Sequence, residues 1–151
     1  MSFVFGSGSL NKLATCHKVL QLIAQKAIEV SPMDFTIVHG FRDEVQQNAF
    51  FDAGASKTPW PDSKHNCSNA AGKPESLAID FAPWHSSLRP QIRWERTEEF
   101  RWLAGFIMGA GESIARSHGY TLRWGGDWDR DGDHRDQTFM DVGHIELVPL
   151  R

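Results

Sequence analysis

Three side chains in this sequence could together hold a catalytic metal ion: His65, Asp80 and His144. A catalytic zinc site takes about three protein ligands and leaves one position for water or substrate. His65 stands in a loop-like stretch, whereas Asp80 and His144 stand at the ends of strand-like runs, which hold ligands rigidly. The chain has 7 histidines and 19 acidic residues, however, so many such triples could be drawn. Taken singly, the three are equally well explained as a solvated histidine, a turn aspartate and a hydrogen-bonded histidine at a strand edge.

An aspartate-rich segment could bind a second cation. Residues 127–133 space their carboxylates and a glycine as the opening of an EF-hand calcium loop does. Thr138 stands where the complete loop has a bidentate glutamate, so the affinity should be lower. A solvated acidic turn is the alternative, but clustered carboxylates repel one another unless a cation or protons intervene. The candidate calcium ligands are Asp127, Asp129, Asp131, Asp133 and Asp136.

Helices and short strands must position these residues. Apolar residues at helical spacing predict helices over residues 9–30, 43–53 and 97–118, the first with Ser9 as its N-cap and an interruption near His17. Apolar, β-branched and aromatic runs predict strands over residues 35–39, 77–81, 120–124 and 143–148.

The order of these elements predicts the fold class. Residues 54–75 are rich in Gly, Pro, Ser, Asn and Lys and have no periodicity, which indicates a long surface loop of the kind that is often functional. Helices and strands do not alternate regularly. We therefore expect an α+β fold: one domain over residues 1–151, with a small, mainly antiparallel sheet flanked by helices and the metal site at strand ends and loops.

Composition limits the partners and the compartment. A chain of 151 residues can bury a core without disulfides, and Cys16 and Cys67 form no disulfide framework, which suits a reducing compartment. The net charge of -3 argues against a nucleic-acid partner. The sequence has no recognisable signal peptide and no run near the ~20 apolar residues of a membrane span. We expect cytoplasmic synthesis, no membrane partner and a monomer.

Three motifs occur in an order that one metallopeptidase family uses: Ser63-Lys-His65, Ser76-Leu-Ala78-Ile-Asp80 and Asp141-Val-Gly-His144. They resemble the SxH, GxAxD and D/E-xxH signature of the family of D-alanyl-D-alanine carboxypeptidases, dipeptidases and phage L-alanyl-D-glutamate endopeptidases. Residues 34–46, 54–58 and 124–128 resemble further parts of that pattern, so the resemblance covers nearly the whole chain and is closest to phage endolysins. The chain departs from the pattern at Ser76, where glycine is usual, and in an expanded segment 66–75. Added length in a surface loop costs little closure entropy.

The resemblance implies a role for each matching residue. His65, Asp80 and His144 would hold zinc, which activates a water and polarises the scissile carbonyl. Asp141 would be the general base that takes a proton from this water and passes it to the leaving amine. A carboxylate that only orients a ligand is the alternative for Asp141.

Three further residues are expected at the substrate. Arg42 matches the arginine that stabilises the developing oxyanion, although a salt bridge with Asp43 or Glu44 would also explain it. Gln46 would support Arg42 or contact substrate, and an exposed helix residue is an equally good explanation. Ser63 is the other candidate for substrate contact.

The implied function is hydrolysis of the L-alanyl-D-glutamate bond in the peptidoglycan stem peptide, during cell lysis by a phage-type endolysin. Such an enzyme would be made in the host cytoplasm and would reach the wall through a pore made by another protein. A D-alanyl-D-alanine carboxypeptidase or dipeptidase would use the same metal chemistry.

A metal-stabilised, non-catalytic wall-binding module is the alternative from another class. The motifs contain no convincing fourth ligand, which a structural zinc site usually has, and this favours catalysis. Six tryptophans could suggest a sugar-binding platform, but most are expected to pack in the core or at its rim.

Overall fold

A four-stranded antiparallel sheet forms the centre of the fold in the computed structural model, which describes residues 2–151. The strand order is β1-β2-β4-β3, so β4, the last strand in sequence, lies between β2 and β3. The strands are β1 (Phe35–His39), β2 (Ala78–Pro83), β3 (Tyr120–Trp124) and β4 (His144–Pro149). The predicted α+β class with an antiparallel sheet is confirmed.

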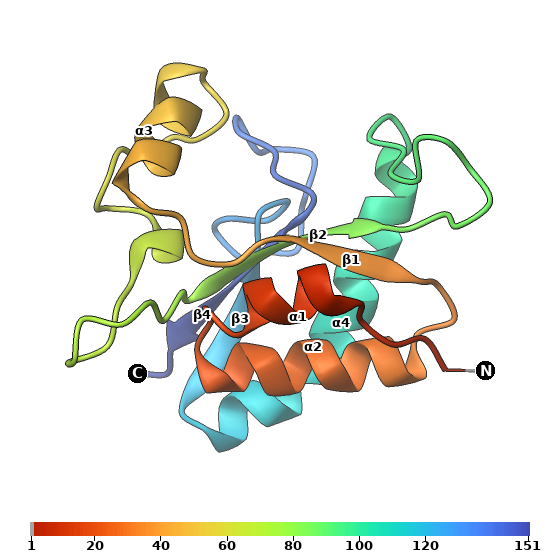
Figure 1. Cartoon of the computed structure of the whole chain (residues 1–151), viewed down its shortest axis with the longest axis horizontal. Coiled ribbons are helices and arrows are strands. Elements are labelled where there is room, and N and C mark those ends of the chain that lie inside the picture. The colour runs from red at the N-terminus through yellow and green to blue at the C-terminus, as the bar shows by residue number, and fades with distance from the viewer. Residues whose placement is uncertain (1) are drawn as a thin grey trace.

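Most of the helices cover one face of this sheet. The helices are α1 (Ser7–Leu13), α2 (Lys18–Val30), α3 (Glu44–Asp52) and α4 (Thr97–Ser117), with a 3-10 turn, η1 (Lys64–Asn66), inside the predicted long loop. α2 packs on α4, α4 on β3 and β2, and α1 on β1, whereas Figure 1 shows α3 and the loop 125–143 on the other side of the sheet. Among residues 2–151, no helix is long and apolar enough to cross a membrane.

The predicted helix over residues 9–30 is interrupted, as expected near His17. There His17 caps α2 by accepting a hydrogen bond from Val19 N through Nδ1, at 3.1 Å. The predicted N-cap of the first helix was wrong, because Gly6 occupies that position. Ser9 is buried inside α1, and its hydroxyl accepts a hydrogen bond from Ile37 N at 3.0 Å, which ties α1 to β1.

Side chains alternate along β2 and β4, so that core residues lie on one face of the sheet and polar residues on the other. Ile79 and Phe81 of β2 are buried in the core, and Asp80 between them points to the opposite face. The same alternation on β4 puts His144 and Glu146 on the face of Asp80. Because successive side chains of a strand point to opposite faces, two rigid strands carry core and polar residues at once.

Candidate metal centre

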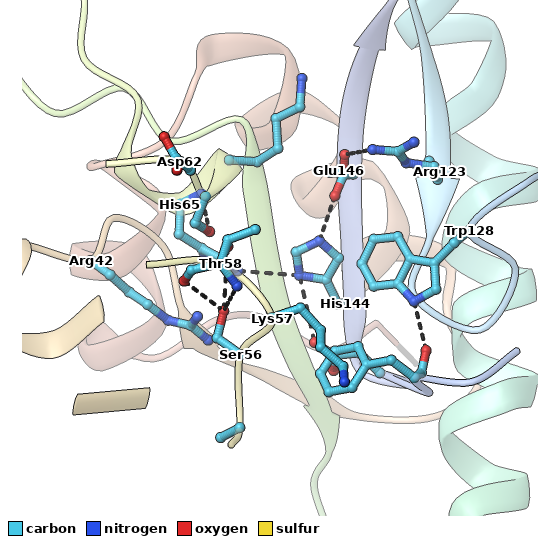
Figure 2. A pocket seen from close by; sticks show the side chains of 15 residues that line it. Arg42, Ser56, Lys57, Thr58, Asp62, His65, Arg123, Trp128, His144 and Glu146 are labelled. Carbon is cyan, nitrogen blue, oxygen red and sulfur yellow. Dashed lines mark hydrogen bonds and ion pairs between the residues drawn. The ribbon is translucent and has the colours of Figure 1, made fainter. Parts of the chain in front are cut away.

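A cleft of about 390 Å³ opens on the face of the sheet that carries these polar residues. Figure 2 shows the side chains around it, which come from the segment after β1, from η1 and the loop before it, from β3 and β4, and from the loop between these two strands. The predicted site residues that line it are Arg42, Ser63, His65, Asp141 and His144.

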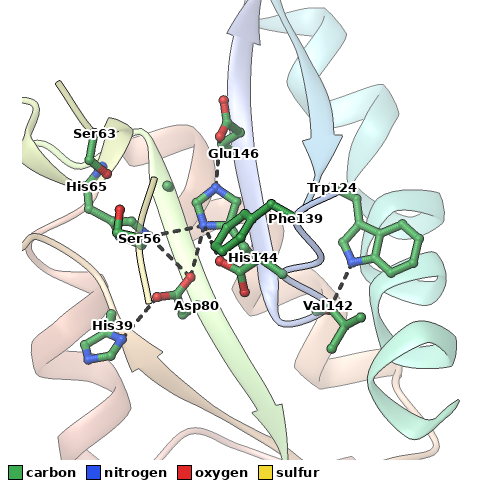
Figure 3. Close-up of polar contacts among 12 residues, drawn as sticks. His39, Ser56, Ser63, His65, Asp80, Trp124, Phe139, Val142, His144 and Glu146 are labelled. Carbon is green, nitrogen blue, oxygen red and sulfur yellow. Dashed lines mark hydrogen bonds and ion pairs between the residues drawn. The ribbon is translucent and has the colours of Figure 1, made fainter. Parts of the chain in front are cut away.

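The structure brings the predicted ligands His65, Asp80 and His144 together. Asp80 and His144 are direct neighbours across β2 and β4, and His65 reaches them from η1. Asp80 Oδ1 lies 3.2 Å from His65 Nε2 and 3.0 Å from His144 Nδ1, and these two nitrogens are 3.2 Å apart. All three residues are buried, and Figure 3 shows their side chains converging.

The partners of the two histidines determine which ring nitrogens face the centre of this group. His65 Nδ1 lies 2.7 Å from the carbonyl oxygen of Gly40, which can only accept, so Nδ1 carries the hydrogen. His144 Nε2 lies 2.9 Å from a carboxylate oxygen of Glu146 and donates to it in the same way. The neutral rings therefore direct their lone pairs at each other and at a carboxylate oxygen. Three electron-pair donors at this distance require a cation between them, which is either a proton or a metal ion.

The donor set and its spacing fit zinc. Ligand atoms that bind a tetrahedral zinc at about 2.0–2.1 Å lie roughly 3.3 Å from one another, and the three atoms here are separated by 3.0 to 3.2 Å. In the part of the chain that the structure describes, this group has three members. Two imidazoles and one carboxylate with a free fourth position are typical of a catalytic zinc site rather than a structural one.

The pKa values of His65, Asp80 and His144 are shifted in different directions. Burial lowers the pKa of His144, but hydrogen bonds to Asp80 and Glu146 outweigh burial and raise that pKa to about 10. Burial lowers the pKa of His65. Burial would raise the pKa of Asp80, but the charge of His65 and hydrogen bonds from histidines hold it well below its usual range.

Arg42 lies beside the metal ligands and not on the surface. Its side chain is buried, its Nη2 donates to Asp80 Oδ2, and its guanidinium lies 4.4 Å above the ring of Phe50. His39 Nδ1 contacts the same carboxylate oxygen at 3.1 Å. The salt bridge that was considered with Asp43 or Glu44 is replaced by one with a candidate metal ligand.

Asp141 stands next to the cluster with its side chain partly open to the cleft. Asp141 Oδ2 lies 3.9 Å from His144 Nδ1. Its backbone is fixed, because Asp141 N donates to the Gly125 carbonyl at 2.8 Å and a side chain at Gly125 would overlap Asp141. Burial, together with the charge of Asp80, raises the pKa of Asp141 to about 6. A carboxylate in this position and with this pKa can act as a general base near neutral pH.

Glu146 is a member of the site that sequence reasoning missed. It is 3% exposed, and its two oxygens accept hydrogen bonds from His144 Nε2 and, at 2.7 Å, from Arg123 Nη2. Carboxylates in this position orient a metal-binding histidine and raise its basicity. The sequence could have predicted this position, since residues two apart in a strand share a face and Glu146 follows His144 by two residues in a predicted strand.

The two predicted substrate contacts differ in their placement. Gln46 is exposed and forms a capping box with Asp43 at the start of α3, so it does not support Arg42. That contact is made by Gln47, which is buried and accepts from Arg42 Nη1 at 3.5 Å. Ser63 lines the cleft and caps η1, where its hydroxyl accepts from His65 N at 3.2 Å.

The structure brings some of the predicted calcium ligands close together. Carboxylate oxygens of Asp127, Asp129 and Asp131 lie close enough together to share an ion. Asp133 is instead ion-paired with Arg135 at 2.8 Å, and Asp136 accepts from the side chain of Gln137 at 2.6 Å. Asp133 and Asp136 make these other contacts in the structure, and calcium binding by the five aspartates stays a prediction.

Two histidines and one carboxylate with a further carboxylate beside them, carried by two strands and a 3-10 turn of an α+β domain, are typical of a metal-dependent hydrolase. The model of the phage L-alanyl-D-glutamate peptidase family matches residues 1–148. The L-alanyl-D-glutamate peptidase of Escherichia phage T5 is 38% identical over 152 residues, which cover 98% of this chain and 100% of that protein. The chain therefore belongs to the phage L-alanyl-D-glutamate peptidase family.

A solved structure of low sequence identity shows the same fold. The L-Ala D-Glu endopeptidase ChiX of Serratia marcescens superposes with a TM-score of 0.67, covering 95% of this chain and 89% of that chain at 22% identity. The vancomycin resistance D,D-dipeptidase VanXYg, solved with a D-Ala-D-Ala phosphinate analogue, gives a TM-score of 0.42 over 97% of this chain and 51% of that chain, at 18% identity.

Proposed function

We propose that this protein is a zinc peptidase that hydrolyses the L-alanyl-D-glutamate bond of the peptidoglycan stem peptide. Membership of the family and the full-length similarity to the phage T5 peptidase support the substrate and the bond. The observation that carries the metal is the convergence of His65 Nε2, Asp80 Oδ1 and His144 Nδ1 at 3.0 to 3.2 Å, with both rings oriented by hydrogen bonds on their far sides.

Each of the residues around this centre has its own role in hydrolysis. Zinc held by His65, Asp80 and His144 would supply Lewis acidity and lower the pKa of a nearby water. Asp141 takes the proton of the attacking water at its carboxylate and delivers it to the nitrogen of the leaving D-glutamate. Arg42 is fixed against Asp80 at the edge of the cleft, where its charge stabilises the oxygen of the scissile carbonyl as negative charge develops.

The biological setting follows from this substrate. A peptidoglycan peptidase of a phage lyses the bacterial wall from within, as an endolysin does. We propose that the protein accumulates in the host cytoplasm and reaches the wall when a separate protein opens the inner membrane.

The test is digestion of purified peptidoglycan, with and without a zinc chelator and with zinc or calcium added back, followed by mass spectrometry of the new termini. We expect chelator-sensitive release of D-glutamate amino termini. The His144→Ala variant should be inactive, whereas His118→Ala, which changes an exposed histidine at the end of α4, should keep wild-type activity.

Other products would assign another function. Release of free D-alanine alone would make the protein a carboxypeptidase of the same chemistry. An absence of cleavage under every metal condition would contradict catalysis and favour a metal-stabilised wall-binding module.

A further inference from the structure

A second hollow adjoins the catalytic cleft on the other side of Asp80. It measures about 300 Å³, within the range of small-molecule sites, and it shares Arg42, Ala55 and Asp141 with the first cleft. The cluster of metal ligands therefore lies at the junction of two hollows. An endopeptidase must hold substrate on both sides of the scissile bond. Two hollows that meet at the proposed general base, Asp141, can do so.

The two hollows differ in charge. The catalytic cleft is lined by Lys57 and Lys64, and among residues 2–151 neither ammonium group is in an ion pair. One carboxylate outside the metal site and the Arg123–Glu146 pair, that of Asp62, is on the same lining. Lys57 extends over the ring of Phe139 at 5.4 Å, and Figure 2 shows it in front of the cleft. The second hollow has no such free cation in the described chain: its charged groups belong to the metal cluster, and the rest of its lining is mainly aromatic and aliphatic.

Trp94 is the most unusual residue of the second hollow. Its side chain is 59% exposed, and its ring stacks on the buried ring of Phe100 at 5.6 Å with an interplanar angle of 21°. One face of the indole is therefore packed on protein and the other is free. A rigid, exposed indole face beside a catalytic centre suits the apolar C–H face of a sugar ring, because an aromatic side chain offers a large contact area of fixed geometry.

The proposed substrate has the same asymmetry as the two hollows. On the acyl side of the scissile bond, L-alanine is joined through a lactyl group to N-acetylmuramic acid, which is an uncharged saccharide once so joined. On the amine side, D-glutamate and the residues after it carry carboxylates. We propose that the second hollow binds the muramyl sugar with its ring stacked on Trp94, and that Lys57 and Lys64 face the carboxylates on the other side. This inference rests on the proposed function and adds the position and direction of the substrate.

The experiment compares two substrates that differ only before L-alanine: N-acetylmuramyl-L-alanyl-γ-D-glutamyl-L-lysine and the same tripeptide with a plain N-acetyl group. Trp94→Ala and Trp94→Leu should each lower kcat/KM about tenfold on the muramyl substrate and leave the acetyl substrate within about twofold. The leucine variant keeps Phe100 covered, so it guards against a general loss of folding. The control is Trp102→Ala, because Trp102 is 47% exposed and stacks on Phe106 at 5.4 Å outside both hollows.

Binding provides a readout that does not depend on turnover. In the zinc-loaded Asp141→Asn background, calorimetry should show that Trp94→Leu weakens binding of the muramyl substrate about tenfold and spares the acetyl substrate. Equal losses on both substrates, or no loss on either, would overturn the assignment of the sugar to Trp94. If the wild type cleaves neither substrate, the proposed function fails, and the binding measurement still decides the role of Trp94.

Discussion

Two hydrogen bonds on the far sides of the histidine rings determine which ring nitrogens are free to bind a metal. The Gly40 carbonyl holds His65 in one tautomer, and Gly40 is itself confined, because a side chain there would overlap Lys12 and Thr15. Glu146 holds the other ring, and it is buried while its partner Arg123 is half-buried. Both ligands are thus oriented before any metal binds, which reduces the ordering that binding requires.

Glu146 should therefore control metal affinity. We expect Glu146→Gln to weaken zinc binding by about 10–100-fold, because the charge that raises the basicity of His144 is lost. Competition with a chromophoric chelator measures this dissociation constant. The matched control is Glu99→Gln, which alters another carboxylate–histidine pair, Glu99 with His85 at 2.7 Å, away from the metal. Equal zinc affinity in the wild type and Glu146→Gln would contradict the role of Glu146.

Asp141 should affect turnover without affecting metal content. Asp141→Asn preserves the shape of the side chain but cannot accept the proton, so we expect kcat to fall by about 10²–10⁴-fold. Zinc stoichiometry, measured by elemental analysis, should stay at the wild-type value, since Asp141 is not one of the three converging ligands. Loss of zinc along with activity would instead make Asp141 a residue that orients or binds the metal.

At the scale of elements, the contact between α4 and α2 depends on Gly111. A Cβ at this position would overlap Ile23 of α2, whereas a Cβ at Gly105 or Gly109 would meet no other atom. Glycine is a poor helix former, and its presence at residue 111 is explained by this close approach.

Alanine substitutions should therefore have opposite effects along one helix. We expect Gly111→Ala to lower the free energy of unfolding by about 1–3 kcal/mol through overpacking. Gly105→Ala should raise it by about 0.5–1 kcal/mol through helix propensity alone. Urea denaturation followed by circular dichroism measures both. A stabilised Gly111→Ala variant would show that α2 can move away without cost.

Element types could be predicted from sequence because apolar periodicity is local, and β1 and β3 have the predicted bounds. Details that depend on distant residues could not. Ser9 resembles an N-cap until β1 is packed against α1, where its hydroxyl bonds Ile37 N. Gln46 and Gln47 are adjacent in sequence, and only the packing of α3 decides which of them meets Arg42.

At the scale of the molecule, the candidate metal centre joins segments that are distant in the chain. His65, Asp80 and His144 come from a 3-10 turn and two strands. They could be predicted as a set because their motifs occur in the order of a known family, whereas the spacing of these residues alone did not single them out. The hollow beside Trp94 could not be predicted, since it depends on which face of the sheet the helices leave open.

Removal of zinc should lower stability as well as activity. A ligand that binds only the folded chain stabilises it by about 4 kcal/mol at a thousandfold excess over its dissociation constant. We expect a chelator to lower the Tm by several degrees and re-added zinc to restore it, as measured by scanning calorimetry. A Tm that does not respond to chelator would indicate that the metal makes no net contribution to folding.

The alternation along β2 and β4 also restricts how the gene can change in length. Because core and ligand side chains share each strand on opposite faces, inserting or deleting one codon there would exchange the two sets, placing Asp80 in the core and Ile79 in the cleft. Insertions in the loops 54–75 and 125–143 leave that alternation intact. Length variation that survives selection should therefore gather in the parts of these loops away from His65 and Asp141, where the walls of the cleft are built, so that a lineage can change its substrate while inheriting the metal centre intact.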